Sequence, residues 1–382
     1  MKIYNLHSPL IDKQTFRHVN NCLKSVWLSP SGNYVQNFEK KINQFTNSRS
    51  VVCNSGTSAL HICLILTGIE SQDEVIVPTI TYIATINSVL YTKASPLFMD
   101  CDSKLSIDIK KLEEFLKKKT VLKKGYCINR ITKKKIKALI VTHVFGDICD
   151  FKKLKKICKK YKIKIIEDAA EAFGSFYKKK YHAGTLGDFG ALSFNFNKII
   201  TAGSGGAVLF KNRMYESKIR KLISHAKIDK VYFKHEGTGY NYGLPNISAA
   251  IGFSQLKKVK KIVKEKLQIY KWYKSFFENY EKIELIEPKS NCSNHWLNSI
   301  VLKDCSYSRF KKIISKLNKK GVHVRPLWYP CHLQKYLKKY QTYKIDYSSK
   351  IYKKLICLPS SHFLKKKDIK KITTIISNAC KF

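Results

Sequence analysis

Short apolar runs alternate with longer amphipathic runs over residues 50–210. The short runs have the length of buried strands and lie at 51–54, 74–77, 97–100, 138–143 and 163–168. The longer runs have the polar and apolar spacing of helices and lie at 59–66, 82–91 and 151–161. Because helical crossovers join parallel strands, this alternation predicts an α/β fold with a large, mostly parallel sheet and helices on both faces.

The alternation is interrupted at 117–137, where a lysine-rich, turn-like sequence predicts an exposed hairpin. The pattern changes again near residue 250. One long lysine-rich helix is expected over 251–279, then strand-like residues at 296–302, a helix, a strand at 322–327 and a final helix. We therefore expect a large domain over 1–250, whose N-terminal segment lines the substrate site, and a smaller α+β domain over 251–382.

The composition is typical of a globular protein, with 44% hydrophobic residues in a chain of 382. The longest apolar runs, such as 138–141 and 163–166, have only the length of a strand, and the first residues lack the apolar core of a signal peptide. We therefore expect a cytoplasmic protein with no membrane attachment.

The formal net charge of +45 comes almost entirely from lysine, which is spread along the whole chain. Runs such as 152–156 fit the solvated faces of amphipathic helices. Because specific base recognition usually needs clustered arginine or a known binding module, we expect no specific nucleic-acid partner. The charge does favour an anionic substrate.

The twelve cysteines stand singly, and no pair has the CxxC spacing. This excludes a zinc site of the usual spacing, and we expect reduced, mostly buried thiols and no bound metal.

Two residues, one carboxylate and one amine, are candidates for a catalytic site. Asp168 ends the run at 163–168, where a buried carboxylate needs a cationic partner such as a protonated ring nitrogen, although a capping or turn aspartate would look the same. Lys198 lies between an aromatic run and the glycine-rich segment 201–206. Desolvation there would free its amine for Schiff-base formation, whereas most lysines in this chain are surface residues.

A phosphate-binding loop is predicted at 55–58, between a strand and a helix. Free backbone N–H groups at a helix start, with hydroxyls beside them, bind a phosphate dianion, although a simple helix cap needs only one hydroxyl. Tyr82 follows the next strand and could stack on a flat ring or serve only in packing.

The order of these features along the chain resembles the pyridoxal phosphate (PLP) enzymes of fold type I, and most closely the DegT/DnrJ/EryC1/StrS sugar aminotransferase family. The motifs that carry the resemblance are NSGTSAL at 54–60, DEVIVP at 73–78, EDAAEAFG at 167–174, GDFG at 187–190, the Lys198 segment and GYNY at 239–242. The resemblance implies a large PLP-binding domain and a smaller C-terminal domain.

The resemblance also implies residue roles. Lys198 would hold PLP covalently and move a proton, Asp168 would pair with the ring nitrogen, Glu171 would approach the ring hydroxyl and Tyr82 would stack on the ring. Gly56, Thr57 and Ser193 would hold the phosphate. Asn241 would reach that phosphate from a second subunit, which makes a homodimer part of the site. Many relatives have arginine where this chain has Gly243, so a contact from that position is in doubt.

A subgroup that makes 4-amino sugars for bacterial surface glycans shares features at 117–137, 141–146 (VTHVFG), 198–201 (KIIT) and 293–298 (SNHWLN). Its likeness implies a UDP-linked 4-keto-6-deoxy-N-acetylhexosamine as substrate and glutamate as amino donor, giving 2-oxoglutarate. Residues that could contact this substrate, each with an ordinary structural role as the alternative, are Trp27, Ser29, His295, Arg325 and His332.

Two other functions stay open. Some relatives are dehydratases or deoxygenases on the same scaffold, but these have histidine at the position of Lys198. A third possibility is a catalytically inactive relative that binds polyanions through its basic surface.

Overall fold

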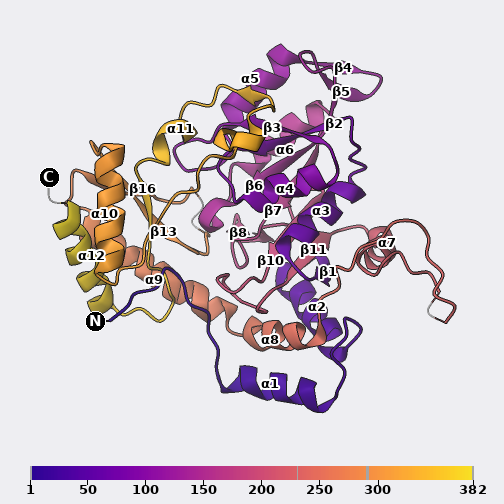
Figure 1. Cartoon of the computed structure of the whole chain (residues 1–382), viewed down its shortest axis with the longest axis horizontal. Coiled ribbons are helices and arrows are strands. Elements are labelled where there is room, and N and C mark those ends of the chain that lie inside the picture. The colour runs from indigo at the N-terminus through magenta and orange to yellow at the C-terminus, as the bar shows by residue number, and fades with distance from the viewer. Residues whose placement is uncertain (1, 230, 290–291, 381–382) are drawn as a thin grey trace.

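A computed structural model describes residues 2–229, 231–289 and 292–380. Its largest feature is a sheet whose main path runs β1-β11-β10-β7-β6-β2-β3-β15 (Figure 1). These strands are β1 (Arg49–Cys53), β2 (Asp73–Pro78), β3 (Ser95–Met99), β6 (Lys135–Thr142), β7 (Lys164–Asp168), β10 (Phe189–Ser193), β11 (Gly206–Phe210) and β15 (Thr342–Tyr343). Along this path the neighbours are parallel except for the two pairs that β11 makes, with β1 and β10. The predicted α/β fold is confirmed.

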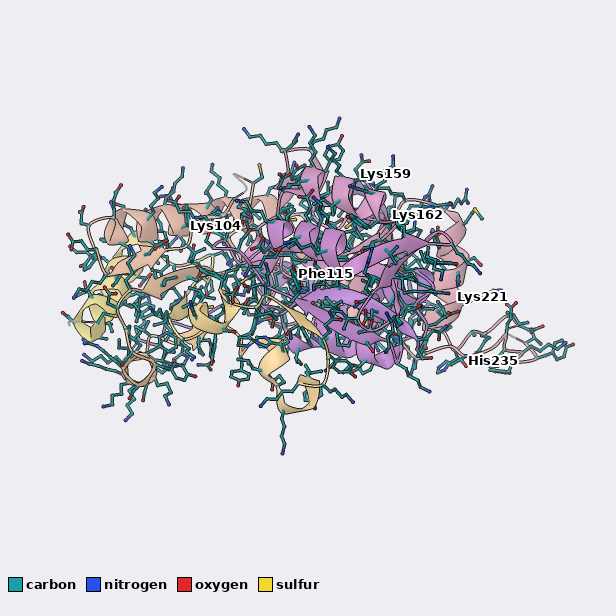
Figure 2. All side chains as sticks on the ribbon, turned by 90° about the horizontal axis from the view of Figure 1, so that it is seen from above. Lys104, Phe115, Lys159, Lys162, Lys221 and His235 are labelled. Carbon is teal, nitrogen blue, oxygen red and sulfur yellow. The ribbon has the colours of Figure 1, made fainter. Side chains whose placement is uncertain are left out.

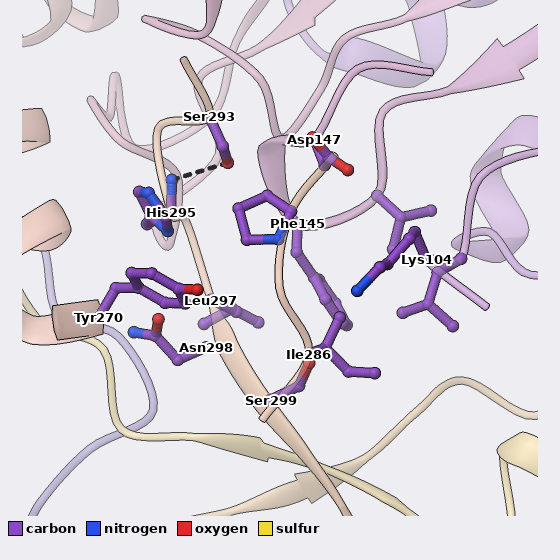
Figure 3. A pocket seen from close by; sticks show the side chains of 13 residues that line it. Lys104, Phe145, Asp147, Tyr270, Ile286, Ser293, His295, Leu297, Asn298 and Ser299 are labelled. Carbon is purple, nitrogen blue, oxygen red and sulfur yellow. Dashed lines mark hydrogen bonds between the residues drawn. The ribbon is translucent and has the colours of Figure 1, made fainter. Parts of the chain in front are cut away.

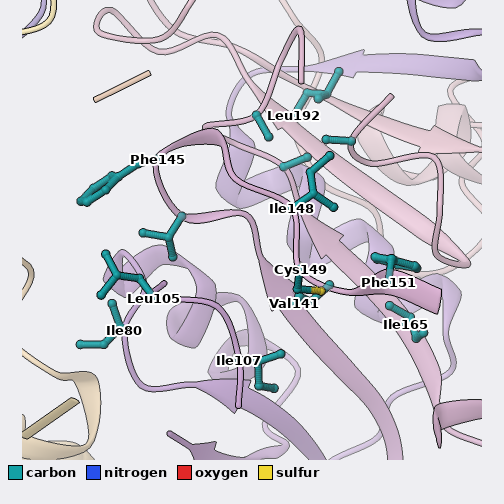
Figure 4. Packing of buried hydrophobic residues seen from close by; sticks show 14 of the residues in the cluster. Ile80, Leu105, Ile107, Val141, Phe145, Ile148, Cys149, Phe151, Ile165 and Leu192 are labelled. Atoms are coloured by element: carbon teal, nitrogen blue, oxygen red, sulfur yellow. The ribbon is translucent and has the colours of Figure 1, made fainter. Parts of the chain in front are cut away.

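Helices cover both faces of the sheet because alternate strand residues are buried on opposite sides. Val75 and Ile140 belong to one core, with helices α3, α4 and α7, whereas Ile76 and Val141 belong to the other, with α2, α5, α6 and α8. Figure 4 shows part of the second core around Val141. The helices are α2 (Asn33–Thr46), α3 (Gly56–Leu66), α4 (Ile83–Tyr91), α5 (Ile109–Lys119), α6 (Phe151–Lys160), α7 (Met214–Ile223) and α8 (Asn246–Leu256).

The predicted hairpin at 117–137 is confirmed as β4 (Thr120–Lys123) and β5 (Tyr126–Asn129). It extends the large sheet, since β5 pairs with β6 in antiparallel fashion. A second hairpin, β8 (Phe176–Tyr177) and β9 (Tyr181–His182), stands apart from that sheet. Helix α1 (Lys13–Lys24), together with α2, was not predicted, and it lies along α8 (Figure 1).

A smaller sheet with order β12-β13-β16-β14 lies beside the large one. Its elements are β12 (Ile283–Leu285), β13 (Asn298–Leu302), β14 (Arg325–Pro326) and β16 (Leu355–Leu358), with α9 (Val259–Phe277), α10 (Tyr307–Lys319) and α12 (Lys366–Cys380) packed around a separate core. The short elements η1 (Val144–Gly146), η2 (Cys331–Leu333), η3 (Lys335–Leu337) and α11 (Ser348–Ile351) lie in connecting segments. Residue 250 lies inside α8, so no break in the chain marks the expected boundary there. The division of the chain into domains at this residue stays a prediction.

Two element predictions were wrong. The single helix expected over 251–279 is broken between Leu256 and Val259. Helix α8 packs in the core of the large sheet, whereas α9 begins in that core, at Val259 and Ile262, and continues into the core of the smaller sheet. The strand expected over 322–327 forms a ladder only at β14, while Val322 makes an isolated parallel bridge with Tyr4. In both segments the apolar pattern was correct, but tertiary contacts decided where the regular structure ends.

None of the helices in the described parts of the chain combines the length and apolar character that a membrane crossing requires.

Asp100 joins the C-terminal segment to the large sheet. Its side chain is fully buried directly after β3. One carboxylate oxygen accepts the N–H groups of Asp346 and Tyr347 at 2.9 Å and the Lys111 ammonium at 2.7 Å, and the other accepts the N–H of Ser348 at 2.9 Å. Burial alone would raise the pKa of Asp100, but hydrogen bonds from Lys111 and Ser348 outweigh it and lower the pKa to about 2.

We expect Asp100→Asn to lower the free energy of unfolding at pH 7 by about 3 kcal/mol, because one amide oxygen cannot serve all of these donors. Since the pKa of Asp100 is lowered on folding, its contribution is complete above about pH 4 and is lost as the pH falls toward 2. Denaturant titrations at pH 7, 4 and 3 should therefore show a shrinking gap between the variant and the wild type. Asp346→Asn, which changes an exposed carboxylate on the same lysine, is the control. A gap that stays constant with pH would contradict this account.

Candidate active site

The carboxyl ends of β6, β7 and β10 and the start of α3 surround a cavity of about 320 Å³. Ligands of open parallel sheets usually bind at this edge. Seven of the predicted site residues line it: Gly56, Thr57, Tyr82, Asp168, Glu171, Ser193 and Lys198. The sequence therefore located most of one continuous site from segments far apart in the chain.

Asp168 lies at the end of β7 and is buried. Its Oδ2 accepts a hydrogen bond from the Thr85 hydroxyl at 2.6 Å, and its Oδ1 accepts one from the Ala170 N–H at 3.2 Å. The carboxylate therefore has a fixed orientation at the cavity wall.

Lys198 follows β10 after a tight turn in which its N–H donates to the carbonyl oxygen of Asn195 at 3.0 Å. The side chain is 13% exposed, and its Nζ lies 3.4 Å from Oε1 of Glu171. The same ammonium lies 4.2 Å from the ring centroid of Trp296. This amine is thus enclosed by an aromatic ring and a carboxylate and still borders the cavity.

Glu171 is buried, and its second oxygen accepts the N–H of Phe145 at 2.9 Å. Phe145 has a φ of 54°, an uncommon left-handed conformation for an aromatic residue. Burial raises the pKa of Glu171 to about 7, although the nearby Lys198 ammonium opposes that increase. Near neutral pH this carboxyl group can therefore hold or release a proton next to the lysine.

The start of α3 lies at one end of the cavity. Ser55 caps the helix by accepting the N–H of Ser58 at 3.0 Å, and the first amides of the helix have no acceptor inside it. Gly56 lies against Ser193, so a Cβ on Gly56 would come within 2.9 Å of the Ser193 Cβ. Thr57 and Ser193 add hydroxyls to this end of the cavity, where the helix dipole favours a negative group.

Tyr82 precedes α4 at the edge of the cavity and is 60% exposed. Its ring therefore has an open face available for a ligand, which is the geometry that stacking requires.

The predicted substrate residues are not among those that line this cavity. His332 contacts the Thr79 hydroxyl through Nδ1 at 2.6 Å, Arg325 is exposed on β14, and Ser29 contacts the Ser31 hydroxyl at 2.9 Å. Trp27 is 57% exposed beside α1 and borders a different surface pocket. Their roles in substrate binding stay predictions.

His295 faces a separate, small cavity of about 30 Å³, shown in Figure 3. Its ring stacks on Tyr270 at 4.5 Å between centroids. Burial, with a smaller effect from Lys266, lowers the pKa of His295 to about 4. A role of His295 in substrate binding stays a prediction, whereas its neighbour Trp296 lines the main cavity.

Asn241 is exposed, and its carbonyl oxygen accepts a hydrogen bond from the side chain of Asn54 at 3.1 Å. This hydrogen bond places Asn241 close in space to the turn at 54–58, but Asn241 is not among the residues that line the cavity within this subunit. Gly243 is packed closely, since a Cβ there would lie 2.7 Å from the Cβ of Pro30.

Several cavity residues were missed by the sequence analysis. They include Thr81, Thr85, Thr142, Asn195, Asn197, Trp296 and Trp328. Thr85 lies three residues after the predicted Tyr82, within the first turn of the predicted helix, and this spacing could have identified it. Trp296 lies in the SNHWLN motif at 293–298, but the sequence analysis assigned no role to it or to Trp328, because only the fold brings them to the cavity from the C-terminal third of the chain.

The residues at 9–377 match the model of the DegT/DnrJ/EryC1/StrS aminotransferase family. This chain belongs to that family, and it is an enzyme of the PLP-dependent sugar aminotransferase class.

Among the relatives is GDP-perosamine synthase of Escherichia coli O157:H7, 34% identical over 90% of each chain. Another is UDP-4-amino-4,6-dideoxy-N-acetyl-beta-L-altrosamine transaminase of Campylobacter jejuni, strain 81-176, 29% identical over 94% of this chain and 93% of the relative. The solved structure of Helicobacter pylori PseC, an aminotransferase involved in the biosynthesis of pseudoaminic acid, matches with a TM-score of 0.89 at 24% identity. The match covers 99% of both chains, and it shows a shared fold.

The residues that line the cavity fit PLP in their donor and acceptor chemistry. The amides of α3 suit a phosphate, Asp168 offers a buried, oriented carboxylate for a ring nitrogen, and Lys198 supplies the amine. The close approach of Gly56 to Ser193 leaves no room for a side chain at the phosphate end.

We expect Glu171→Gln to change the pH dependence of stability measured before PLP is added. Because the pKa of Glu171 rises from 4.5 to about 7 on folding, the wild type loses stability as the pH rises across that interval. Glutamine has no such penalty, so the variant should gain about 2 kcal/mol relative to the wild type between pH 5 and pH 8. Denaturant titrations check this, with the exposed Glu113→Gln as control. Parallel stability curves for the wild type and Glu171→Gln would refute the buried-carboxyl assignment.

Proposed function

We propose that this enzyme transfers the amino group of glutamate to C4 of a nucleotide-linked 4-keto-6-deoxyhexose. The observation that carries the proposal is the position of the Lys198 amine, which borders a cavity shared with the Asp168 carboxylate and the start of α3. No other described lysine lines this cavity.

In this proposal each residue has a distinct task. PLP, when bound, supplies an electron-withdrawing ring that stabilises negative charge at the reacting carbon. Lys198 anchors the cofactor, and its released amine moves a proton to and from the substrate carbon. Asp168 keeps the ring nitrogen protonated, Glu171 holds a proton beside the lysine, and Trp296 and Tyr82 limit access of water to the amine.

The identity of the sugar nucleotide has two candidates. The likeness to the Campylobacter jejuni transaminase supports the UDP-linked 4-keto-6-deoxy-N-acetylhexosamine inferred from sequence motifs. The higher identity to the Escherichia coli GDP-perosamine synthase supports a GDP-linked 4-keto-6-deoxyhexose. We favour the GDP-linked sugar, since that relative shares more of the sequence over a comparable length.

We expect the wild type with PLP to show a visible absorbance band that disappears on addition of glutamate. Lys198→Ala should not form the lysine-linked band. Its rate of amino transfer should be lower by roughly a thousand-fold, because the covalent anchor and the proton carrier are both gone. Lys211→Ala, an exposed lysine beyond β11, is the control and should match the wild type.

The same preparations identify the reaction and the sugar. With nitrogen-15-labelled glutamate, mass spectrometry should find the label in the product of the GDP-linked ketosugar and less in that of the UDP-linked one. Label only from the UDP-linked sugar would reverse our choice of nucleotide. A product that loses oxygen without gaining nitrogen would instead identify a dehydratase, and a colourless wild type that binds nucleic acid would favour the polyanion-binding alternative.

We also propose that the active enzyme is a homodimer. The segment after α7 projects from the molecule, as the position of His235 in Figure 2 shows. It presents apolar side chains to solvent, including Val231, Tyr232 and Phe233, with exposed fractions of 75%, 76% and 66%. Exposed apolar clusters of this kind mark protein interfaces, and Asn241 lies where this segment returns to the subunit.

Mixed dimers test whether Asn241 acts across the interface. Lys198→Ala and Asn241→Asp should each be inactive alone, the second because its carboxylate repels the cofactor phosphate. When the two are co-expressed, about half of the dimers are mixed, and each mixed dimer has one site with an intact lysine and an intact partner asparagine. About a quarter of wild-type activity should therefore return. A monomer in sedimentation experiments, or no recovery, would contradict the shared site.

We place the reaction in the cytoplasm. Eleven of the twelve cysteines are buried as free thiols, which suits a reducing compartment.

A further inference from the structure

Three threonine hydroxyls form a chain that ends on Asp168. The Thr142 hydroxyl lies 3.1 Å from that of Thr81, which lies 2.7 Å from that of Thr85, and Thr85 donates to Asp168 Oδ2 at 2.6 Å. The threonines come from three places: the end of β6, the segment after β2, and the first turn of α4. All four side chains are buried, and all four line the cavity.

The direction of these hydrogen bonds follows from the number of protons. A hydroxyl donates one proton, and an ionised carboxylate only accepts. Since Thr85 donates to Asp168, its remaining interaction with Thr81 must be as an acceptor, so Thr81 donates to Thr85. Thr81 then accepts from Thr142, and every donor in the chain points toward Asp168. Successive hydrogen bonds of this kind polarise one another and strengthen the last one.

We propose that Thr85 is the positioning residue of Asp168: its hydroxyl, supported by Thr81 and Thr142, holds the carboxylate oriented toward the ring nitrogen of the cofactor. This inference rests on the proposed function, because it assigns the ring-nitrogen contact to Asp168. The Thr85 hydroxyl donates a hydrogen bond to Oδ2 of Asp168, and the Ala170 N–H donates one to Oδ1. These two bonds fix the plane of the carboxylate before a ligand binds.

The contact is specific to the hydroxyl group and not to the shape of the side chain. Valine has nearly the shape of threonine but cannot donate, which would leave Oδ2 buried without its partner. Serine keeps the donor and loses only a methyl group. A positioning role therefore predicts that Thr85→Val is impaired and Thr85→Ser is not, whereas a packing role predicts the opposite.

The first measurement is the dissociation constant of PLP, obtained by adding it to cofactor-free protein. We expect Thr85→Val to weaken binding about tenfold, and Thr85→Ser to stay within about threefold of the wild type. In steady-state assays, kcat should fall by about ten- to a hundred-fold in Thr85→Val with little change in the KM for glutamate, because the defect lies at the ring and not at the amino donor. Thr142→Val, at the far end of the chain, should show a smaller effect in the same direction.

Thr67→Val is the matched control, because the Thr67 hydroxyl binds the Cys63 carbonyl oxygen at the other end of α3. Thermal melting establishes that each variant folds. If Thr85→Val does not fold, Thr81→Val and Thr142→Val carry the test, with losses of PLP affinity expected in both.

Equal PLP affinity and kcat in Thr85→Val and the wild type would overturn the proposal, and so would an equal loss in Thr85→Ser and Thr85→Val. A wild type that binds PLP but does not respond to glutamate would refute the proposed function instead. In that case the PLP affinities of the variants would still decide the role of Thr85.

Discussion

Buried polar groups at the carboxyl edge of the large sheet must have partners, and this constraint organises the whole site. A buried carboxylate without donors would cost several kcal/mol, so Asp168 and Glu171 are held by hydroxyl and backbone N–H groups and by one lysine. Glu167 satisfies the same constraint one residue before Asp168, where it accepts three backbone N–H groups from the loop that leads into β10. That loop is thereby held close to β7, and β10 in turn carries Lys198 to the cavity.

The parts of the fold and the site that could be predicted are those encoded by local patterns. The strand that ends at Asp168, the capped turn at Gly56 and the glycine-rich segment after Lys198 each have a short sequence signature. Trp296 lies over the lysine but comes from a distant segment, and its burial there depends on how the smaller sheet packs against the larger one. The break between α8 and α9 was missed because apolar residues keep a helical spacing across it, at Leu256, Val259 and Ile262.

The lysines that give the large positive charge and the carboxylates differ in where they lie in the structure. Most lysines lie on the surface, whereas many of the fewer carboxylates are buried, where they accept hydrogen bonds from backbone and side-chain donors. Asp100, Glu39 and Glu167 are examples that connect separate segments. The excess of cations therefore lies mainly on the surface and outside the cavity, where Lys198 is the one described lysine in the lining.

A comparison of Lys266 with Lys198 shows why position, and not burial alone, must be considered when a reactive amine is sought. Lys266 is completely buried, and desolvation lowers its pKa to about 7, which by itself would suggest a nucleophile. Its Nζ, however, donates to the carbonyl oxygens of Trp296 and Ser360 at 2.9 and 2.6 Å. It does not line the main cavity, so its amine acts as a link between α9 and the wall of the site. Lys198 has a carboxyl group that can exchange protons as its close polar neighbour, and it also borders the cavity. The hydrogen bond from Lys266 to the Trp296 carbonyl oxygen thus supports the aromatic wall against which Lys198 lies.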